Sequence, residues 1–205
     1  MKRLVSFEGG EGCGKTTLMN NLKAYLEKNS IDFISTREPG GIEENEKIRE
    51  ILKTTENLSP ITQILLFSAS RSNLVDKIII PNVESGKLVL MDRYFDSTRI
   101  YQGYCYDISD ETIMNITNLA IKGMVPEITF FLDIDPVIAF RRKGGPDNKD
   151  VIENIGIEYH QKVREGFLRL AKKEPNRFVV VDATLSPEEV LNIVVKNLKE
   201  RKIIG

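Results

Sequence analysis

The stretch LVSFEGGEGCGKT, residues 4–16, decides the fold of this chain. Residues 4–7 form a short apolar run typical of a buried strand, and residues 15–28 repeat apolar side chains at helical spacing. The loop between them, residues 9–16, has the spacing G-x-x-x-x-G-K-[ST] and lies between a strand and a helix, as this type of phosphate-binding loop requires. The sequence therefore predicts a site for nucleotide phosphates at the start of the helix.

The residue types in the loop suit an anionic ligand. Glycines let backbone N–H groups turn towards a phosphate without a clash of Cβ atoms, and the positive end of the helix dipole points at the same place. Lys15 is expected to reach the β- and γ-phosphates, and the Thr16 hydroxyl to complete a Mg²⁺ coordination sphere. A glycine-rich turn that binds nothing is the alternative. The candidate triphosphate-binding residues are Gly9, Gly10, Glu11, Gly12, Cys13, Gly14, Lys15, Thr16 and Thr17.

Short β-branched runs alternate with helical segments along the rest of the chain. Further strands are expected at 31–36, 88–91, 128–132 and 178–181, and further helices at 43–54, from 59 towards 81, at 110–122, at 136–142, up to about 172, and after a capping box at 186–189. This order predicts an α/β fold with a doubly wound, five-stranded parallel sheet flanked by helices. Such sheets bind ligands beyond the C-terminal ends of their strands. The segments 37–75 and 141–154 are expected to form flaps over that edge.

The composition is that of a globular chain without a strong charge bias. The chain has 205 residues, the size of one domain, and its 29 basic and 30 acidic residues give a net charge of −1. This balance argues against a general grip on nucleic acid, and no apolar run approaches the ~18 residues of a membrane span. Cys13 and Cys105 lie far apart, and residues 1–8 show no signal-peptide pattern. We expect a single cytoplasmic domain over 1–205 with no nucleic-acid or membrane partner.

Four blocks of sequence together resemble one enzyme family over nearly the whole chain. They are FEGGEGCGKTT (7–17), TREPGG (36–41), LLFSASR (65–71), and DRY (92–94) with ST (97–98) and YQG (101–103). The chain resembles thymidylate kinase of the bacterial type, within the P-loop nucleoside monophosphate kinases. The resemblance implies transfer of the γ-phosphate of ATP to dTMP, giving dTDP and ADP for dTTP synthesis, with Mg²⁺ and in a homodimer. It also implies a monophosphate-binding flap at about 37–75 and a lid at about 141–154.

The resemblance also implies a site for the thymine base and its sugar. Phe67 matches the ring that stacks on thymine. Its periodicity alone favours ordinary core packing, and only the neighbouring Arg71 and the family block favour the stacking role. Arg71, one helical turn later, would donate to the base O4. Tyr101 matches the ring that crowds the sugar 2′ position, and the Gln102 amide would read the N3/O4 edge of thymine.

Arginines and one carboxylate are the candidates for the phosphate and metal contacts. Arg37, Arg49 and Arg93 would clamp the monophosphate, because a guanidinium donates to phosphate in a bidentate fork; a solvated helix face is the alternative for Arg49. Asp92 resembles the carboxylate that holds Mg²⁺ together with Thr16, and an ion pair with Arg93 or a strand-end cap is its alternative. Ser97 and its neighbour Thr98 are polar candidates beside the substrate, with a helix N-cap as the simpler interpretation.

The catalytic candidates implied by the resemblance are Lys15, Glu11, Arg93 and Arg142. Glu11 matches the acidic loop residue near the sugar 3′-OH and the phosphate-binding arginines. The lid departs from the family pattern, since residues 150–153 read DVIE where an arginine follows the aspartate in the family. Our hypothesis is that Arg142 or Lys143, beside the Gly-Gly-Pro hinge at 144–146, supplies the missing cation.

Other positions have weaker or bland interpretations. Arg141 or Arg142 is expected to stack on adenine, which residues 182–186 would flank. His160 is expected to be a packed or surface imidazole without a catalytic part, and the run Ile78–Ile80 suits either a deep core or a dimer seam. The alternatives for the whole chain are another pyrimidine nucleotide kinase and a nucleotide-binding regulatory module with weakened catalysis, which the valine at 151 would favour.

Overall fold

The chain forms two compact units. The computed structural model describes residues 3–142 and 149–205, with side chains outside 149–155. Unit 1 holds the chain up to Ser6 and Asp32–Glu127, and unit 2 holds Phe7–Ile31 and Ile128–Gly205. None of the helices within the described ranges is both long and apolar enough to cross a membrane.

Five parallel strands form one sheet, as the alternating pattern predicts. The strands are β1 (Leu4–Gly9), β2 (Phe33–Arg37), β3 (Leu88–Asp92), β4 (Ile128–Asp133) and β5 (Phe178–Asp182), in the order β2-β3-β1-β4-β5. Strand β1 contributes to both units, since the unit boundary follows Ser6. Strand β2 begins two residues later than predicted, because the Ile31 N–H donates to the Leu26 carbonyl at the end of the preceding helix.

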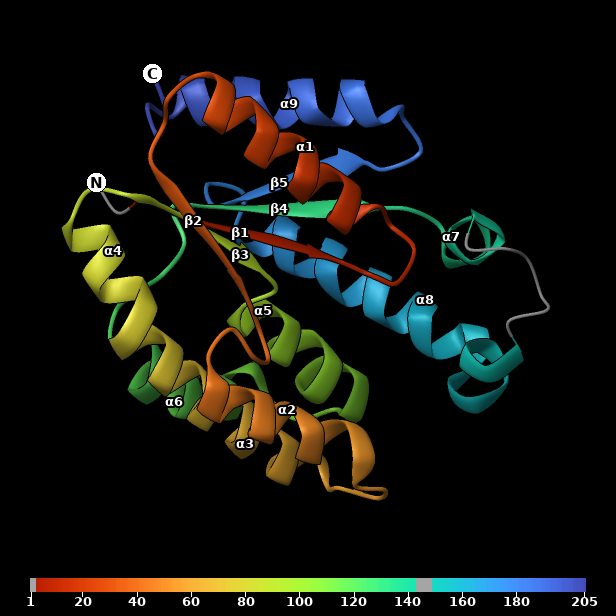
Figure 1. The fold of residues 1–205 in the computed structure, drawn as a ribbon. Coiled ribbons are helices and arrows are strands. Elements are labelled where there is room, and N and C mark those ends of the chain that lie inside the picture. Colours follow the sequence, from red (N-terminus) through yellow and green to blue (C-terminus); the bar gives the residue numbers. More distant parts are fainter. Residues whose placement is uncertain (1–2, 143–148) are drawn as a thin grey trace. The chain divides into compact units, whose positions relative to one another are not determined.

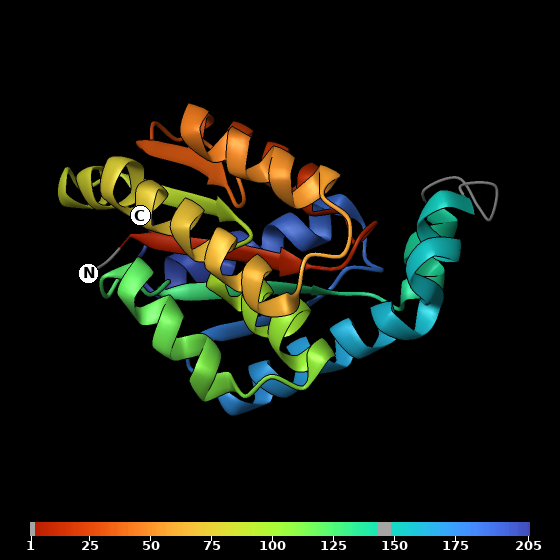
Figure 2. The ribbon, with the colours of Figure 1, turned by 90° about the horizontal axis from the view of Figure 1, so that it is seen from below.

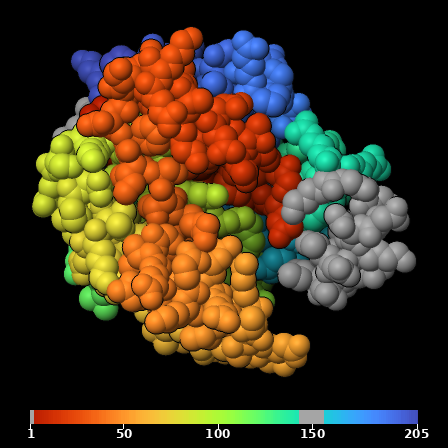
Figure 3. Space-filling model, viewed as in Figure 1, coloured from red at the N-terminus to blue at the C-terminus, as the bar shows by residue number. Residues whose placement is uncertain are grey.

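In unit 2, helices cover both faces of the sheet. Helices α1 (Lys15–Lys28) and α9 (Pro187–Glu200) lie side by side on one face, and α8 (Lys149–Lys173) packs on β4 and β5. The space-filling view shows the atoms of α1, in red and orange, beside those of α9, in blue (Figure 3). The short helix α7 (Pro136–Arg142) follows β4 (Figure 1). Stacking of Phe131 on Phe167, with ring centres 4.8 Å apart, joins β4 to α8.

In unit 1, α3 (Pro60–Leu74) packs between two other helices. These are α2 (Glu43–Thr54) and α6 (Asp110–Ile121) (Figure 2). Asn45 is the fully buried residue of α2, Ile48, Arg49 and Leu52 are half-buried, and the other residues of that helix are exposed. Around the strand ends run the short helices α4 (Ile80–Glu84) and α5 (Phe95–Thr98), the π-helical segments η1 (Val75–Ile79) and η2 (Arg99–Gly103), and the 3₁₀ segment η3 (Tyr104–Tyr106).

The isoleucine run at 78–80 contributes to the core of unit 1. Helix α3 continues through the π-helical η1 into α4, so the helical path passes Pro81 and ends at Glu84. Ile79 is fully buried, and the partly buried Ile78 and Ile80 pack against the same apolar cluster. The wider π turn lets these consecutive apolar residues reach one core, and a dimer seam over the exposed parts of Ile78 and Ile80 stays a prediction.

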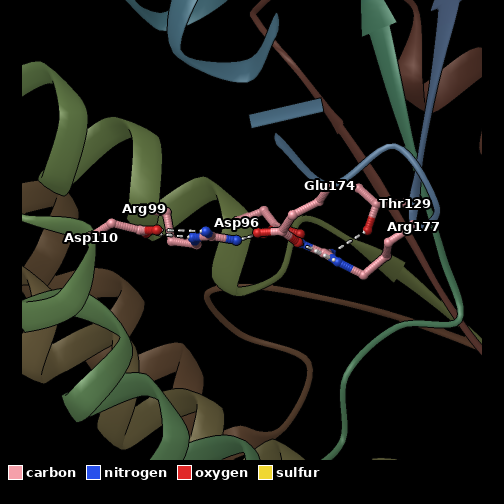
Figure 4. Close-up of polar contacts among 6 residues, drawn as sticks. All are labelled: Asp96, Arg99, Asp110, Thr129, Glu174 and Arg177. Carbon is pink, nitrogen blue, oxygen red and sulfur yellow. Dashed lines mark hydrogen bonds and ion pairs between the residues drawn. The ribbon is translucent and has the colours of Figure 1, made fainter. Parts of the chain in front are cut away.

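One arginine in each unit joins two segments of that unit by hydrogen bonds (Figure 4). In unit 1, Arg99 pairs with Asp96 at 3.1 Å and with both oxygens of Asp110 at 2.7 and 2.8 Å, which ties η2 to the start of α6. In unit 2, Arg177 donates to Glu174 at 2.6 Å and to the Thr129 hydroxyl at 2.8 Å, which ties the end of α8 to β4. The bonds of Arg99 thereby hold η2, which carries two of the site residues described below, Tyr101 and Gln102.

Candidate functional site

The loop between β1 and α1 has a backbone that favours glycine at two positions. Gly14, the N-cap of α1, has φ 88°, and Gly12 has φ 69°, both in the left-handed region. A Cβ on Gly12 would lie 2.6 Å from the carbonyl oxygen of Ala139 in α7, well inside van der Waals contact. The glycines predicted from the motif therefore have a local structural reason in this chain.

The start of α1 presents its backbone donors to a ligand. Among the described residues no side chain caps this helix, and its first turn contains no acidic residue. The first N–H groups of a helix have no partner within the helix, and together with the helix dipole they form a site for an anion. Lys15 is half-buried beside them, and Thr16 and Thr17 are exposed.

Unit 2 contains a cavity of about 480 Å³ at this loop, which we call the loop cavity. From the loop and α1 it is lined by Gly12, Cys13, Gly14, Thr17 and Leu18, from α7 by Arg142, and from the start of α9 and the turn before it by residues 183–187 and Val190. Several of the predicted triphosphate-binding residues therefore meet the segment predicted to flank adenine. Gly10 and Glu11 lie instead at a smaller cleft with His160.

Arg142 and Asp182 hold the turn after β5, whose residues 183–187 line the loop cavity. Arg142 donates from Nη1 to the Ala183 carbonyl at 2.6 Å and from Nη2 to the Thr184 carbonyl at 3.0 Å. Asp182 accepts from the Thr184 hydroxyl at 2.6 Å and from its N–H at 2.8 Å, and these bonds lower the pKa of the Asp182 carboxyl. The Arg142 guanidinium thus lies at the turn after β5, which is the predicted base side of the cavity.

Unit 1 contains a second cavity, of about 250 Å³, which we call the arginine cavity. Six residues predicted to bind the substrate line it: Phe67, Arg71, Arg93, Ser97, Tyr101 and Gln102. Glu38, Pro39, Tyr94 and Thr98 line it too. The sequence analysis gave no role to Glu38, Pro39 or Tyr94. All three lie inside the quoted family blocks, and this position was the signal that could have identified them.

Arg71 is the central polar group of the arginine cavity. Its side chain is fully buried; Nε and Nη2 donate to Glu38 Oε2 at 2.9 and 2.7 Å, and Nη2 also donates to the Thr98 hydroxyl at 3.0 Å. Nη1 is buried and has no hydrogen-bond partner among the described residues. Burial raises the pKa of the Glu38 carboxyl, and the Arg71 guanidinium opposes that shift. One donor of a fixed guanidinium is therefore left for a ligand.

The end of β3 and the π-helical segment place the other cavity residues. Arg93 has φ 63°, a left-handed conformation that is uncommon outside glycine. It donates to the Ser97 hydroxyl at 3.1 Å and lies 5.0 Å from the centre of the Tyr101 ring. Because α5 continues into the π-helical η2, residues 97, 98, 101 and 102 all face the cavity. The N–H of Glu38 donates to the Asp92 carbonyl, which joins the TREPGG and DRY blocks.

Arg37 and Arg49 do not line the arginine cavity. Arg37 is half exposed and pairs with Glu46 at 2.9 Å, and Arg49 donates to the Pro39 carbonyl at 2.9 Å. Arg49 is thus bound to the TREPGG block and is not simply solvated. The N–H of Gly41 and the Arg37 guanidinium beside Glu46 lower the pKa of the Glu46 carboxyl.

The candidate metal residues lie in different units. Thr16 is in the first turn of α1, and Asp92 is the last residue of β3. The described residues contain no group of three or more acidic, histidine or cysteine side chains that could enclose a metal ion by themselves. A hydroxyl and a single carboxylate are hard oxygen donors, and Mg²⁺ commonly takes only one or two protein ligands beside phosphates and water. The residues present fit an ion carried by the nucleotide.

Some weaker predictions also have a structural outcome. Ser97 and Thr98 are not helix N-caps, because α5 has Tyr94 at that position and both residues lie inside the helix. His160 is buried and packs edge-to-face on Phe140, with ring centres 4.9 Å apart. Arg141 is exposed at the end of α7. The side chains of Lys143 and Val151 and the hinge at 144–146 lie outside the described residues.

Comparison of the chain with known proteins shows its family. A family model described as thymidylate kinase matches residues 7–194, which is most of the chain. The chain belongs to the thymidylate kinase family. A thymidylate kinase of Caldanaerobacter subterraneus subsp. tengcongensis is 42% identical over 199 residues, covering 97% of this chain and 95% of the relative. One of Dehalococcoides mccartyi strain 195 is 44% identical over 197 residues, covering 95% and 94%.

A solved structure agrees with the sequence relatives. The crystal structure of thymidylate kinase from Ehrlichia chaffeensis matches with a TM-score of 0.80 at 33% identity, covering 97% of this chain and 98% of that chain. This solved family member thus shares the α/β fold of the chain, and the resemblance stated from the four sequence blocks is confirmed.

Proposed function

We propose that this thymidylate kinase transfers the γ-phosphate of ATP to dTMP, giving dTDP and ADP for dTTP synthesis. The observation that carries the proposal is the arginine cavity, where a buried Arg71 keeps one donor, Nη1, without a partner among the described residues, beside Phe67 and Tyr101. A flat aromatic platform and a single fixed donor suit a pyrimidine with a carbonyl oxygen. The family relatives point to the same reaction.

On the acceptor side, Phe67 would stack on thymine and Arg71 would donate to its O4. Tyr101 would crowd the 2′ position of the sugar and so favour deoxyribose. Arg93 would hold the monophosphate from the end of β3, where its conformation is already fixed by Ser97 and Tyr101. Arg37 and Arg49 stay predictions as further clamps, because neither lines the cavity.

On the donor side, the loop from Gly9 to Thr17 would hold the ATP phosphates. The N–H groups at the start of α1 and the Lys15 ammonium would neutralise the charge that develops during transfer. Thr16 and Asp92 would hold Mg²⁺, which, when bound, draws charge from the β- and γ-phosphate oxygens. Because the acceptor phosphate oxygen is already ionised near neutral pH, no protein nucleophile or general base is needed. Glu11 would act near the sugar and the arginines.

Arg142 has two possible roles, which one experiment separates. Its bonds to the Ala183 and Thr184 carbonyls support a role in holding the base of ATP, whereas the departure in the lid sequence suggested a transition-state cation. A role at the base predicts that Arg142→Ala raises KM for ATP with little change in kcat. A transition-state role predicts a large fall in kcat. Full turnover with unchanged KM would exclude both.

The remaining expectations concern assembly, movement and location. Ile61 and Leu65 on α3 and Leu119 on the adjoining α6 are 43, 52 and 80% exposed, which supports a homodimer through these helices. Sedimentation of Leu65→Glu, compared with wild type, tests the dimer, since the variant should sediment as a monomer.

The segments at about 37–75 and 141–154 stay predicted as flap and lid. A location in the cytoplasm stays a prediction.

The proposal is tested by following the transferred phosphate itself. In ³¹P NMR of Mg·ATP with dTMP, we expect the resonances of dTDP to grow as those of ATP fall. Lys15→Ala should abolish this conversion, because the developing charge loses its cation. Loss of ATP into inorganic phosphate without dTDP would contradict the proposal.

A further inference from the structure

A pair of amide side chains connects the arginine cavity to a backbone carbonyl behind it. Gln63, in the first turn of α3, donates from Nε2 to the Leu58 carbonyl at 2.9 Å. Its Oε1 accepts a hydrogen bond from Nε2 of Gln102 at 3.1 Å. Gln102 lines the cavity and is buried, while Gln63 does not line it.

The chemistry of this chain fixes which way each amide points. A backbone carbonyl only accepts, so the end of Gln63 that meets Leu58 must be its NH₂ group. The opposite end, Oε1, then faces Gln102 and can only accept, so Gln102 must present its own NH₂ group there. Its Oε1 accepts no hydrogen bond from any described residue. The amide of Gln102 is thereby held with its carbonyl oxygen as the polar atom left for a ligand.

The cavity therefore offers one fixed donor and one fixed acceptor. The donor is Nη1 of Arg71, because Nε and Nη2 are occupied by Glu38 and Thr98. The acceptor is Oε1 of Gln102. A 4-oxopyrimidine presents the complementary pair, a carbonyl oxygen at position 4 and an N–H at position 3. A 4-aminopyrimidine presents an amino donor and a ring-nitrogen acceptor, so both of its groups would meet the wrong partner.

We propose that Gln63 is a positioning residue for base selection, because it prevents the Gln102 amide from rotating into the orientation that would accept a 4-aminopyrimidine. The proposal rests on the proposed use of dTMP and deepens it. A free amide can turn by half a revolution and exchange its donor and acceptor, and an acceptor held on one side removes that freedom. Gln63 thus acts through Gln102 and without touching the substrate.

The test compares dTMP with dCMP in Gln63→Met, which keeps the side-chain length and removes both polar atoms. We expect the ratio of kcat/KM for dTMP to that for dCMP to fall about tenfold, the scale of one mismatched buried polar group. The kcat for dTMP should stay within about twofold, with KM carrying the change. Gln161→Met, the same substitution at an exposed position of α8, is the matched control.

A double variant separates positioning from a general structural effect. In Gln102→Met, where no amide remains to be oriented, adding Gln63→Met should leave the ratio unchanged within about twofold. An unchanged ratio in Gln63→Met alone, or a further fall of the ratio when Gln63→Met is added to Gln102→Met, would overturn the proposal. If the wild type itself fails to phosphorylate dTMP, the proposed function fails, and that result is read from the same assay.

Discussion

Arg71 combines the properties of a core residue and a ligand-binding residue. Its burial is complete, yet its charge is met by Glu38 and one of its donors is kept for the cavity. The sequence predicted part of this, because a spacing of four residues puts Phe67 and Arg71 on one face of a helix. Glu38 could not be found that way, since it lies 33 residues earlier and reaches Arg71 only through the fold.

Breaking this buried pair is expected to destabilise unit 1. Arg71→Met leaves the Glu38 carboxylate buried without its partner, so we expect the free energy of unfolding to fall by about 3–5 kcal/mol. The double variant Glu38→Met with Arg71→Met should recover most of the loss, because no uncompensated charge remains. Urea unfolding measures the free energy of unfolding of the single and double variants. Losses that simply add in the double variant would show that the two side chains do not compensate each other's charge.

The same pair predicts a pH dependence. Burial raises the pKa of Glu38 above its ordinary 4.5. Between 4.5 and the raised value the folded protein holds a proton that the unfolded chain has released, so stability falls as pH rises through that window. Removing Arg71 removes the group that opposes the shift. We therefore expect the stability deficit of Arg71→Met to shrink as the pH falls towards 4.5, in unfolding curves measured at several pH values. A deficit independent of pH would show that the charge of Glu38 is not its cause.

At the scale of elements, long periodic segments were predictable and short ones around the site were not. The strands, α1, α2, α6 and α9 follow apolar spacing and caps, and they lie where the sequence predicts them to within one or two residues at most ends, with β2 beginning two residues late. Helix α5 and the π-helical η2 cover four and five residues, too few to show a period. The motif residues there were recognisable as types, but the turn that brings Ser97, Tyr101 and Gln102 to one cavity was not.

The capping box of α9, next to the loop cavity, gives an element-scale prediction. The N–H and hydroxyl of Ser186 donate to Glu189 Oε2 at 2.9 and 2.7 Å, and these bonds lower the pKa of Glu189. A lowered pKa means that this stabilisation is present above 4.5 and is lost as pH falls through the folded-state value. Glutamine accepts the same bonds without titrating, so Glu189→Gln should lose less stability between about pH 5 and about pH 3 than wild type.

The matched variant removes the cap at every pH. Ser186→Ala should lower the free energy of unfolding by about 1 kcal/mol at neutral pH, because the N–H of Glu189 loses its acceptor. Thermal or urea unfolding of the two variants distinguishes them. If the free energy of unfolding falls equally with pH in wild type and Glu189→Gln, the Glu189 carboxylate does not cause the acid dependence.

At the scale of the whole molecule, the sequence predicted the class of fold and most of one cavity. The phosphate-binding loop and the alternation of strands and helices follow from local chemistry, so the parallel sheet was predictable. The set of six residues in the arginine cavity came from the family blocks. The amide chain from Leu58 through Gln63 to Gln102 had no sequence signal, because three ordinary residues acquire their meaning only from which atoms meet.

The initial rate of ADP formation from Mg·ATP, with dTMP, dUMP, dCMP, AMP or no acceptor, tests the central claim most directly. Turnover requires the donor phosphate and the acceptor to react in line, and water to be excluded from the reacting phosphate. We predict a strong preference for dTMP, weak use of dCMP and AMP, and a negligible rate without acceptor. Equal rates with all acceptors, close to the rate without any, would contradict the account.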